Sequence, residues 1–450
     1  MGSHSSKKGP FSRIPEYNLD HFGVITILFN PIKYRSRYEW YHRFDEHMSR
    51  SNVTLLTVEC IFDCADELDL PQQKFEITSP NDSRHLQIRA PSVLWLKENL
   101  INIAVKRLPA FVEYIAWIDC DIEFERLDWA QITIHQLQRY SVVQLFDIAY
   151  FLGPGGKKDV LREDYSFAYA YRHDWQIDAR RSPTCLFHPG YGWAMRRSVF
   201  ENMGGLLEFA VLGSGDLHFA YALINRIDET IPHSVHDDYR SLARIWGQRV
   251  AQLVGNGSSV GYLPIHIWHY WHGSRENRGY FERWSILEEH QYSPLRDLEK
   301  NDYLGLIRLN ADRRKTSAND AKRLSSFEKA IVAYFRSRDE DSLKKTTPSI
   351  NDPNTKLSVS DTLPPSRTKD VDQASDEYHE YIPLENTRSG HVINQLNATS
   401  LTNTPQFYHL QSLNTDHPSG YHNQGFHSDY THSARQNLAS ELASITEVSF

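Results

Sequence analysis

Two aspartates stand one residue apart at the end of an apolar stretch of the chain. Asp119 and Asp121 directly follow the run 111–118, in which aliphatic and aromatic residues predominate. Carboxylate oxygens are the ligands that hard divalent cations prefer, and a cation held by them can neutralise a diphosphate. Similar acidic pairs recur at 339–341 and 370–372, but these lie in polar stretches and are predicted to be solvated charge. The apolar context therefore makes Asp119 and Asp121 a candidate metal and phosphate site.

Short apolar runs alternate with helical patterns in the part of the chain that leads to these aspartates. Residues 38–48 and 94–108 repeat apolar side chains at helical intervals. The runs typical of buried strands are 23–29, 53–58, 111–118 and 142–146. Strands that alternate with helices predict an α/β fold with a mostly parallel central sheet flanked by helices. Ligands of such sheets bind outside the carboxyl ends of the strands, where Asp119 and Asp121 fall.

Three later segments carry further polar groups that could do chemistry. A glycine-loosened loop at 188–195 leads into a strand, and the flexible turn 213–216 presents Asp216 at the start of a helical run, 217–224. Asp216 is interpreted either as a cap of that helix or as a free carboxylate. Histidines recur at three-residue intervals further on, at His266, His269 and His272. Because positions three apart in a strand face opposite sides, a shared role of the last two requires a bend at Tyr270.

The composition divides the chain into three parts and excludes some function classes. We expect an N-terminal arm at 1–20, one globular domain at 21–345 and a low-complexity, disordered C-terminal tail at 346–450, which is too polar to form a core. The net charge of −8 and the absence of a basic stripe argue against nucleic-acid binding. The four cysteines form no CxxC or zinc spacing and are predicted to be free thiols: Cys60, Cys64, Cys120 and Cys185.

The N-terminus matches the N-myristoylation pattern, with Gly2 to accept the acyl chain, Ser6 at the favoured position and Lys7 and Lys8 after it. An unmodified start is the alternative. No run approaches the ~18 apolar residues of a membrane span, and no apolar signal region is present. The sequence therefore predicts a cytoplasmic protein. Because one acyl chain anchors only marginally, lipidation predicts reversible, peripheral contact with the cytosolic face of a membrane.

Taken in order, six segments between residues 23 and 284 resemble the GT-A glycosyltransferases of the β-1,4-galactosyltransferase type and the related family-2-like enzymes. ITILFNP resembles their first strand, and ENLINIAVKRL with YIAWIDCDIEF resembles their asparagine-bearing helix and DxD strand. GYGWAMRRSVFENMGGL is similar to the acceptor segment, and GSGDLHFAYAL stands in place of the acidic motif. HYWHGSRENRGYFERW is similar to the C-terminal metal-binding stretch. The resemblance implies a Rossmann-like GT-A fold.

Carried over to this chain, the resemblance implies roles for single residues. Asp121, His269 and His272 would bind Mn²⁺ (or Mg²⁺), and Asp119 would lie nearer the donor ribose. Asp216 would be the general base, which implies inversion at the anomeric carbon. Further donor-binding candidates are Asn30, Glu59, Asn99, Asn102, Arg275 and Arg278. Acceptor-binding candidates are Trp193 and Gly215, with Trp268 and Trp271 as further parts of an apolar platform for a sugar ring.

Most of these assignments have a structural alternative. Asp119 and Asp121 would cap the next turn and pair with Arg126, the histidines and tryptophans would be packed aromatic side chains, and Arg275 and Arg278 would lie in a solvated loop. Asn99 and Asn102 would orient a loop. His266 is predicted to be structural, and His233 and His236 to face solvent.

The sequence thus predicts a metal-dependent glycosyltransferase that moves a sugar from a nucleotide-sugar donor, most simply UDP-linked, to a glycan or other hydroxyl acceptor. The chain departs from the family at the acidic motif, where Asp216 stands alone. Acceptor contacts must therefore differ. Two rivals stay open: a nucleotidyltransferase or metal phosphohydrolase that uses the same site, and a non-catalytic scaffold that binds glycan or partners.

Overall fold

The main sheet of the computed structural model has seven strands in the order β11-β6-β10-β4-β1-β2-β3. The structure describes residues 14–177, 187–280, 282–301 and 303–343, which all belong to one unit, Met1–Leu357. The strands are β1 (Phe22–Phe29), β2 (Leu55–Phe62), β3 (His85–Ala90), β4 (Tyr114–Ile118), β6 (Val142–Gln144), β10 (Gly192–Arg196) and β11 (Val260–Tyr262). Every strand pair is parallel except the two that β10 makes with β4 and β6.

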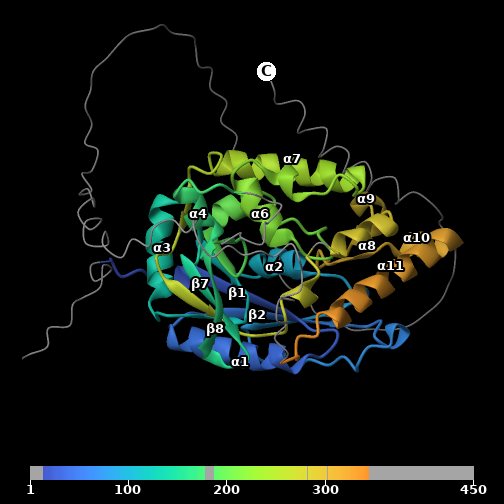
Figure 1. The fold of residues 1–450 in the computed structure, drawn as a ribbon, viewed down its shortest axis with the longest axis horizontal. Helices are drawn as coiled ribbons and strands as arrows, with labels where there is room; N and C mark the ends of the chain where they lie inside the picture. The colour runs from blue at the N-terminus through green and yellow to red at the C-terminus, as the bar shows by residue number, and fades with distance from the viewer. Residues whose placement is uncertain (1–13, 178–186, 281, 302, 344–450) are drawn as a thin grey trace, which may run out of the picture. The chain divides into compact units, whose positions relative to one another are not determined.

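Helices cover both faces of this sheet (Figure 1). The longer ones are α1 (Arg35–Arg50), α2 (Lys97–Val105), α3 (Trp129–Arg139), α6 (Gly215–Leu223), α7 (Asp237–Leu253) and α11 (Ala318–Ser337). The shorter ones are α4 (Phe167–Arg172), α5 (Arg197–Asn202), α8 (Arg283–Glu289), α9 (Pro294–Asp297) and α10 (Ala311–Thr316). The described residues also form the short 3₁₀ helices η1 (Leu19–His21), η2 (Asp66–Leu68), η3 (Ile227–Thr230) and η4 (Glu276–Arg278).

The two-residue period of a strand decides which core each side chain joins. In β1, Val24 and Leu28 belong to the cluster that contains the buried face of α1, whereas Ile25 and Phe29 belong to the cluster that contains α2. Because both faces are covered, β1 is almost continuously apolar, as parallel strands are. The fold class predicted from the sequence, α/β with a mostly parallel sheet flanked by helices, is confirmed.

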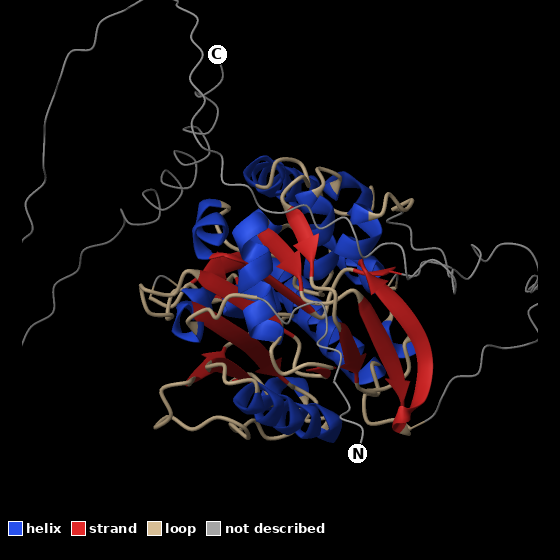
Figure 2. Cartoon of the chain, turned by 90° about the vertical axis from the view of Figure 1, so that its left-hand side faces the viewer, coloured by secondary structure: helices blue, strands red, loops and turns tan. Residues whose placement is uncertain are grey.

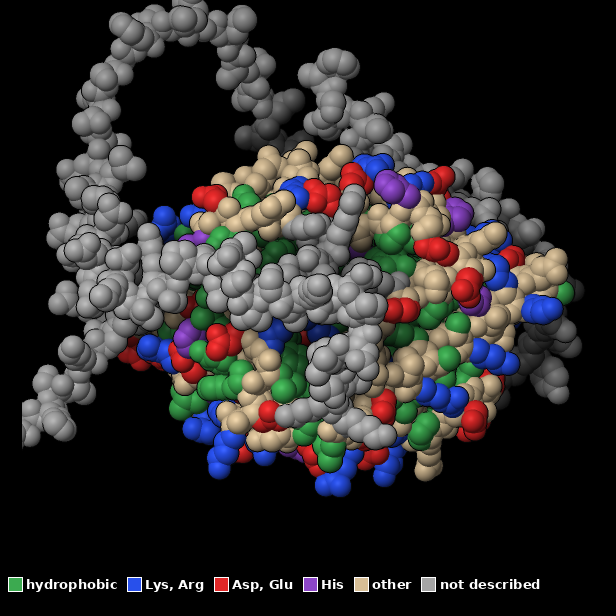
Figure 3. Space-filling model, in the orientation of Figure 1, with side chains coloured by type: hydrophobic (Ala, Val, Ile, Leu, Met, Phe, Trp, Pro, Cys, Tyr) green, Lys and Arg blue, Asp and Glu red, His purple; other side chains and the backbone are tan. Residues whose placement is uncertain are grey.

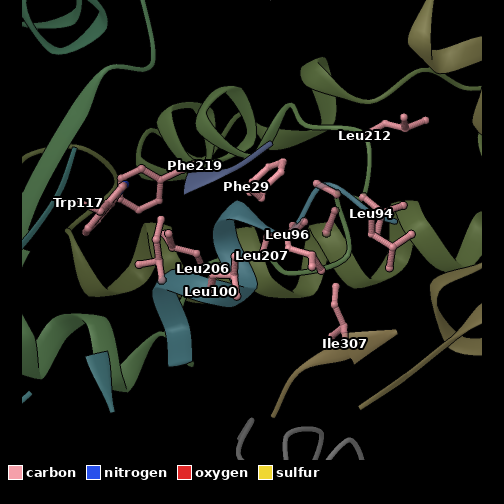
Figure 4. Packing of buried hydrophobic residues seen from close by; sticks show 14 of the residues in the cluster. Phe29, Leu94, Leu96, Leu100, Trp117, Leu206, Leu207, Leu212, Phe219 and Ile307 are labelled. Atoms are coloured by element: carbon pink, nitrogen blue, oxygen red, sulfur yellow. The ribbon is translucent and has the colours of Figure 1, made fainter. Parts of the chain in front are cut away.

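Helix α2 is held against the sheet by the larger of the two clusters. Figure 4 shows Leu100 of α2 packed among Phe29, Trp117, Leu207 and Phe219, which come from separate elements. Leu100 is fully buried, and burial of a leucine is worth about 2 kcal/mol. This packing fixes the direction of the polar first turn of α2.

A second sheet of five strands, in the order β5-β12-β7-β8-β9, brings the histidine segment next to the aspartates. Its strands are β5 (Ile122–Phe124), β7 (Ile148–Gly153), β8 (Gly156–Ser166), β9 (Phe187–His188) and β12 (His266–His269). β12 pairs with β5, which begins one residue after Asp121, and His269 lies opposite Ile122. In Figure 2, helices (blue) lie above and below the central strands (red), and the long curved strands at the right have no helix outside them.

The described chain ends in a short segment, 338–343, which we call the C-terminal strap. It follows α11 and a small hairpin of β13 (Leu298–Lys300) and β14 (Ile307–Leu309). The carboxylate of Asp341 accepts hydrogen bonds from the backbone N–H groups of Arg35 and Ser36, both at 2.8 Å. Since α1 lacks a side-chain cap of its own, Asp341 satisfies donors that the first helical turn leaves unpaired.

The element boundaries differ from the sequence predictions by a few residues. The predicted strands correspond to β1, β2, β4 and β6, and the helix predicted at 94–108 is shorter, Lys97–Val105. The strands of the second sheet other than the one near residue 270 were not predicted, because their side chains alternate less clearly. Among the described residues, no helix combines the length and apolar character needed to cross a membrane. The predicted acylation site Gly2, Cys185 and the predicted tail lie outside the described residues.

The visible face of the molecule in Figure 3 carries Lys and Arg side chains (blue) interspersed with Asp and Glu side chains (red). Of the cysteines, Cys60, Cys64 and Cys120 are free. Burial raises the pKa of Cys64 to about 12, with a further contribution from Glu328, so this thiol stays protonated at neutral pH.

Candidate active site

A cavity of about 900 Å³ lies where β1 and β4 end. Its wall includes Phe29 of β1, the residues 119–121 after β4, the first turn of α6 and residues from 269 to 284. The strand order reverses here, since β1 lies between β2 and β4. Ligands of doubly wound sheets bind at such a switch point, and a volume of this size suits a small-molecule or nucleotide ligand.

Asp121, His269 and His272 meet in this cavity and form a group that could hold a metal ion. The potential ligand atoms of the three lie within 4.8 Å of one another. The Nε2 atom of His272 is 2.9 Å from Oδ2 of Asp121 and 3.1 Å from Nε2 of His269. β12 ends at His269, and the next residue, Tyr270, donates its N–H to the carbonyl of Asp121 at 2.8 Å. The chain therefore leaves the strand at the place where joint ligation requires it.

Two polar atoms of this group have no hydrogen-bond partner among the described residues: Oδ1 of Asp121 and Nδ1 of His269. Buried polar atoms without partners are rare in proteins, and a metal ion in this group would account for Oδ1 of Asp121. Nε2 of His269, and not Nδ1, is the ring nitrogen that faces Asp121 and His272. Burial lowers the pKa of His269 to about 3, and burial together with Arg278 lowers that of His272 to about 4. Both imidazoles are thus neutral at pH 7, the form that binds metal.

The third ligand is anionic. Burial alone would raise the pKa of Asp121, but His272, His269 and Arg37 bring it well below its ordinary value. One carboxylate and two neutral imidazoles form a donor set for a divalent transition-metal cation. The residues present therefore fit a metal ion.

Asp119 points away from this group and pairs with Lys97, the first residue of α2. The Nζ atom of Lys97 is 2.6 Å from Oδ1 of Asp119 and 3.0 Å from Oδ2 of Asp216. Burial would lower the pKa of Lys97, but these two carboxylates raise it, so the side chain stays cationic. Lys97 thus joins the loop after β4 to the first turn of α6. The alternative pairing with Arg126 is wrong, since Arg126 pairs with Asp128.

Asp216 lies in the first turn of α6 and lines the cavity. Ser214 occupies the N-cap position, and the helix has no side-chain cap, so the capping interpretation of Asp216 is not what the structure shows. Gly215 also lines the cavity. A Cβ atom at Gly215 would come within 1.9 Å of Oε1 of Glu98, so glycine is required here by the close approach of that carboxyl.

Lys97 and Glu98 are cavity residues that were not predicted. Glu98 is buried, and burial, followed by the charge of Asp216, raises its pKa to about 8. It places a second acidic group near Asp216 from another helix. A signal was present in the sequence: two adjacent charged residues open an otherwise buried helix, and such residues need partners.

Arg275 and Arg278 both line the cavity, as expected of groups that could contact a phosphate. Arg278 is 7% exposed, and its Nη2 donates toward the ring nitrogen Nδ1 of His272 at 2.9 Å. Its Nε atom is buried and has no partner among the described residues. The solvated-loop alternative is therefore wrong for Arg278.

The prediction of solvated charge at 339–341 is wrong for its central residue. Glu340 is 1% exposed and accepts hydrogen bonds from Nη2 of Arg37 at 2.8 Å and from Nε of Arg338 at 2.6 Å. Both arginines line the cavity. Sequence alone could not find this site, because its members come from α1 and from the strap, some 300 residues apart.

Asn30 and Glu59, predicted as donor contacts, hold loops and do not line the cavity. Asn30 closes the turn after β1 through both its amide atoms, with Tyr34 as partner. The carboxylate of Glu59 accepts from the backbone N–H groups of Glu76, at 2.7 Å, and Thr78, at 3.0 Å. A donor role for either residue is therefore not supported by the geometry.

Asn99 and Asn102 likewise serve the loops, as the structural alternative predicted. Asn99 donates to the carbonyl of Gly305 and accepts from the N–H of Ile307. Asn102 makes the same pair of bonds with the backbone of Leu206. The prediction that they contact a donor is replaced by this anchoring role.

The tryptophan platform is not formed by the predicted residues. Trp193 is fully buried and donates its indole N–H to the carbonyl of Pro189, so the prediction of an acceptor-binding Trp193 is wrong. Trp268 and Trp271 also lie outside the cavity wall.

Trp95 and Trp284 line the cavity instead. Neither had been singled out, because nothing in sequence separates a lining tryptophan from a core one. His266 is structural as predicted and pairs with Asp147, while His236 caps α7. His233 lines the cavity and is exposed.

When the chain is compared with known proteins, only solved structures match it. No family model and no curated protein matches the sequence, whereas 54 chains of solved structures match. The catalytic domain of Drosophila β-1,4-galactosyltransferase 7 with xylobiose is 12% identical, with a TM-score of 0.29, over 66% of this chain and 96% of that chain. A mutant of the same protein with manganese, UDP-Gal and xylobiose is 14% identical, with a TM-score of 0.28, over 66% and 97%.

A third structure, an inferred nucleotide-diphospho-sugar transferase of Desulfovibrio desulfuricans, is 11% identical, with a TM-score of 0.26, over 70% of this chain and 97% of that one. All three are described as sugar transferases, the class that the sequence resembles. At TM-scores below 0.5 the likeness carries no conclusion about chemistry, which rests on the cavity.

Proposed function

We propose that this protein is a metal-dependent GT-A glycosyltransferase that moves a sugar from a nucleotide-sugar donor, UDP-linked, to a hydroxyl of a glycan or other acceptor. One observation carries the proposal. A single cavity holds the group of Asp121, His269 and His272 and, separate from it, the carboxylate of Asp216. A cation site beside an independent base is the arrangement that transfer from a diphosphate needs.

The bound cation would neutralise the charge that develops on the leaving diphosphate. Asp216 is placed to accept the proton of the acceptor hydroxyl as its oxygen bonds to the anomeric carbon. The bond from that carbon to the diphosphate oxygen breaks, and its electron pair leaves with the diphosphate. Attack from the face opposite to the leaving group predicts inversion.

Lys97 and Glu98 extend this assignment. Lys97 binds Asp216 and Asp119 together, so it orients the base toward the donor side of the cavity. Glu98 offers a hydrogen-bonding group to an acceptor hydroxyl from α2, where the related enzymes place further carboxylates in the acidic motif itself. Trp284 and Leu217 supply apolar wall for a sugar ring.

The proposal is tested with purified protein, Mn²⁺ and a panel of UDP- and GDP-sugars, with release of nucleoside diphosphate as the readout. We expect metal-dependent release from one donor, lost in Asp121→Ala and retained in Asp63→Ala, which changes an exposed carboxylate paired with Arg89. Release of pyrophosphate or phosphate instead would favour a nucleotidyltransferase or phosphohydrolase. No release and no nucleotide binding would favour the scaffold.

A further inference from the structure

Three arginines from distant parts of the chain line one side of the cavity, next to the candidate metal group. Arg37 belongs to α1, Arg278 to the segment after β12, and Arg338 to the C-terminal strap. Each is at least partly buried, and burial of a guanidinium requires a partner or a ligand. Together they make this wall cationic.

Glu340 fixes two of these arginines in place. It accepts from Arg37 and from Arg338, and its Oε2 is 3.9 Å from Nδ1 of His272. Burial would raise the pKa of Glu340, but Arg37 and Arg338 bring it well below its ordinary value, so it is ionised. Three guanidinium groups thus face two carboxylates, those of Glu340 and Asp121. The wall keeps an excess positive charge even before a cation binds.

Several hydrogen-bond donors of these arginines remain unused. Among the described residues, buried Nε of Arg278 has no hydrogen-bond partner, and none accepts from Nη2 of Arg338. Arg338 is also held in place by the ring of Trp95, 5.2 Å from its guanidinium carbon. A guanidinium that is fixed by a carboxylate and has free N–H groups suits the oxygens of a phosphate.

The strap is joined closely to the loop that carries His272. Gly273 has φ +85°, and a Cβ there would lie 2.8 Å from the carbonyl of Asp339, so only glycine permits this approach. The indole N–H of Trp271 donates to the carbonyl of Ser342 at 2.7 Å. The C-terminal strap is therefore packed against the loop that carries His272 of the candidate metal group.

We propose that Arg338, positioned by Glu340, binds the diphosphate of the donor, so that the C-terminal strap is part of the donor site. The inference rests on the proposed function for the identity of the ligand. The excess positive charge matches the extra negative charge that the nucleoside diphosphate gains when the sugar leaves. The wall thus binds the leaving group more strongly than the intact donor, which is how binding energy promotes a reaction.

The test is a calorimetric titration of pyrophosphate with Mn²⁺ into the full-length protein, since this probe carries the diphosphate chemistry alone. Arg338→Met is expected to weaken binding about 10- to 100-fold, the range for a hydrogen bond to a charged group. The matched control is Arg336→Met, two residues earlier, where the side chain bonds the carbonyls of Leu68 and Asp69 outside the cavity. Unchanged binding by a folded Arg338→Met protein would overturn the proposal.

A second variant covers the case in which Arg338→Met does not fold. Arg338→Lys keeps the charge and loses the planar fork, so we expect folding with binding weakened by about 3- to 10-fold. Binding equal to wild type in Arg338→Lys would then refute the role of the fork.

The two proposals fail separately. Pyrophosphate binding that depends on Arg338, with no sugar transfer from any donor, would leave the diphosphate site standing and remove the glycosyltransferase. Sugar transfer by a protein whose affinity for pyrophosphate does not depend on Arg338 would support the glycosyltransferase and refute the role of Arg338 in diphosphate binding.

Discussion

The two sides of the cavity hold their charged groups in different ways. On the metal side, Oδ1 of Asp121 is buried and has no hydrogen-bond partner among the described residues. On the base side, Asp119 and Asp216 are both already paired with Lys97. The difference indicates that the metal side is built to be completed by a ligand, whereas the base side is aligned by the protein itself. Removing a residue should therefore affect binding on one side and turnover on the other.

The largest effect is expected on the metal side. Asp121→Ala removes the one anionic ligand and leaves two neutral imidazoles, so Mn²⁺ affinity should fall by more than about 100-fold. Calorimetric titration with Mn²⁺ measures it, with Asp63→Ala as the control. Equal affinity in both variants would remove the metal assignment.

On the base side, Asp216→Asn should lower the rate of sugar transfer by about 10²- to 10⁴-fold, the usual contribution of a general base. Binding of UDP with Mn²⁺ should stay within about twofold, because Asp216 does not belong to the metal group. The measurement is initial rate together with calorimetric affinity. A parallel loss of both would contradict the separation of the two sides.

Lys97 tests whether the base needs its partner. Lys97→Met should lower kcat about 10- to 100-fold through loss of the ion pairs that orient Asp216, with a smaller change in donor KM. Lys97→Arg keeps the charge and should restore part of the rate. If both variants melt at the wild-type temperature and turn over normally, Lys97 has no positioning role.

The metal histidines also predict a pH dependence of stability for the metal-free protein. Their folded-state pKa values, about 3 and 4, lie below the unfolded value near 6.5. The unfolded chain therefore binds more protons below pH 6.5, and the free energy of unfolding falls as the pH drops from 6.5 toward 4, by about 1.4 kcal/mol per histidine per pH unit.

Urea denaturation at pH 7.5 and 5 measures this difference. His272→Asn should reduce it, and His42→Gln, at an exposed position, should not. An equal slope in wild type and His272→Asn would show that His272 is not held neutral by burial.

The smallest effect is expected from shortening the chain after 345, which keeps the strap and should change the melting temperature by no more than about 2 °C. Ending the chain after 337 deletes the strap, including Glu340 and Asp341, and should lower both the melting temperature and the affinity for pyrophosphate. Calorimetric melting of the two shortened proteins makes the comparison. Unfolding of the longer one would refute the predicted domain boundary.

Much of the site was predictable because its parts are local in sequence. Asp119 and Asp121 can be recognised because they directly follow an apolar strand. His269 and His272 can be recognised by their three-residue spacing, which requires a bend in the chain for joint ligation. Lys97, Glu98 and Glu340 were missed because each acquires its role from partners on other elements. Trp193 was predicted wrongly for the same reason. The surrounding sequence is compatible with an aromatic side chain that packs on a sugar ring, but the packing of β10 against the core buries Trp193.

The sequence by itself determined the alternation of strands and helices, and with it the edge of the sheet at which the aspartates lie, since strand period and apolar pattern are local properties. Only the tertiary structure decided which charges meet. Packing of segments that are distant in sequence places Lys97 between two carboxylates and Glu340 between two arginines. Burial then sets the pKa values of these groups and the strength of their ion pairs. Neither contact could be predicted from the positions of these residues in the sequence, because their burial and the distances between them are set only when the chain packs.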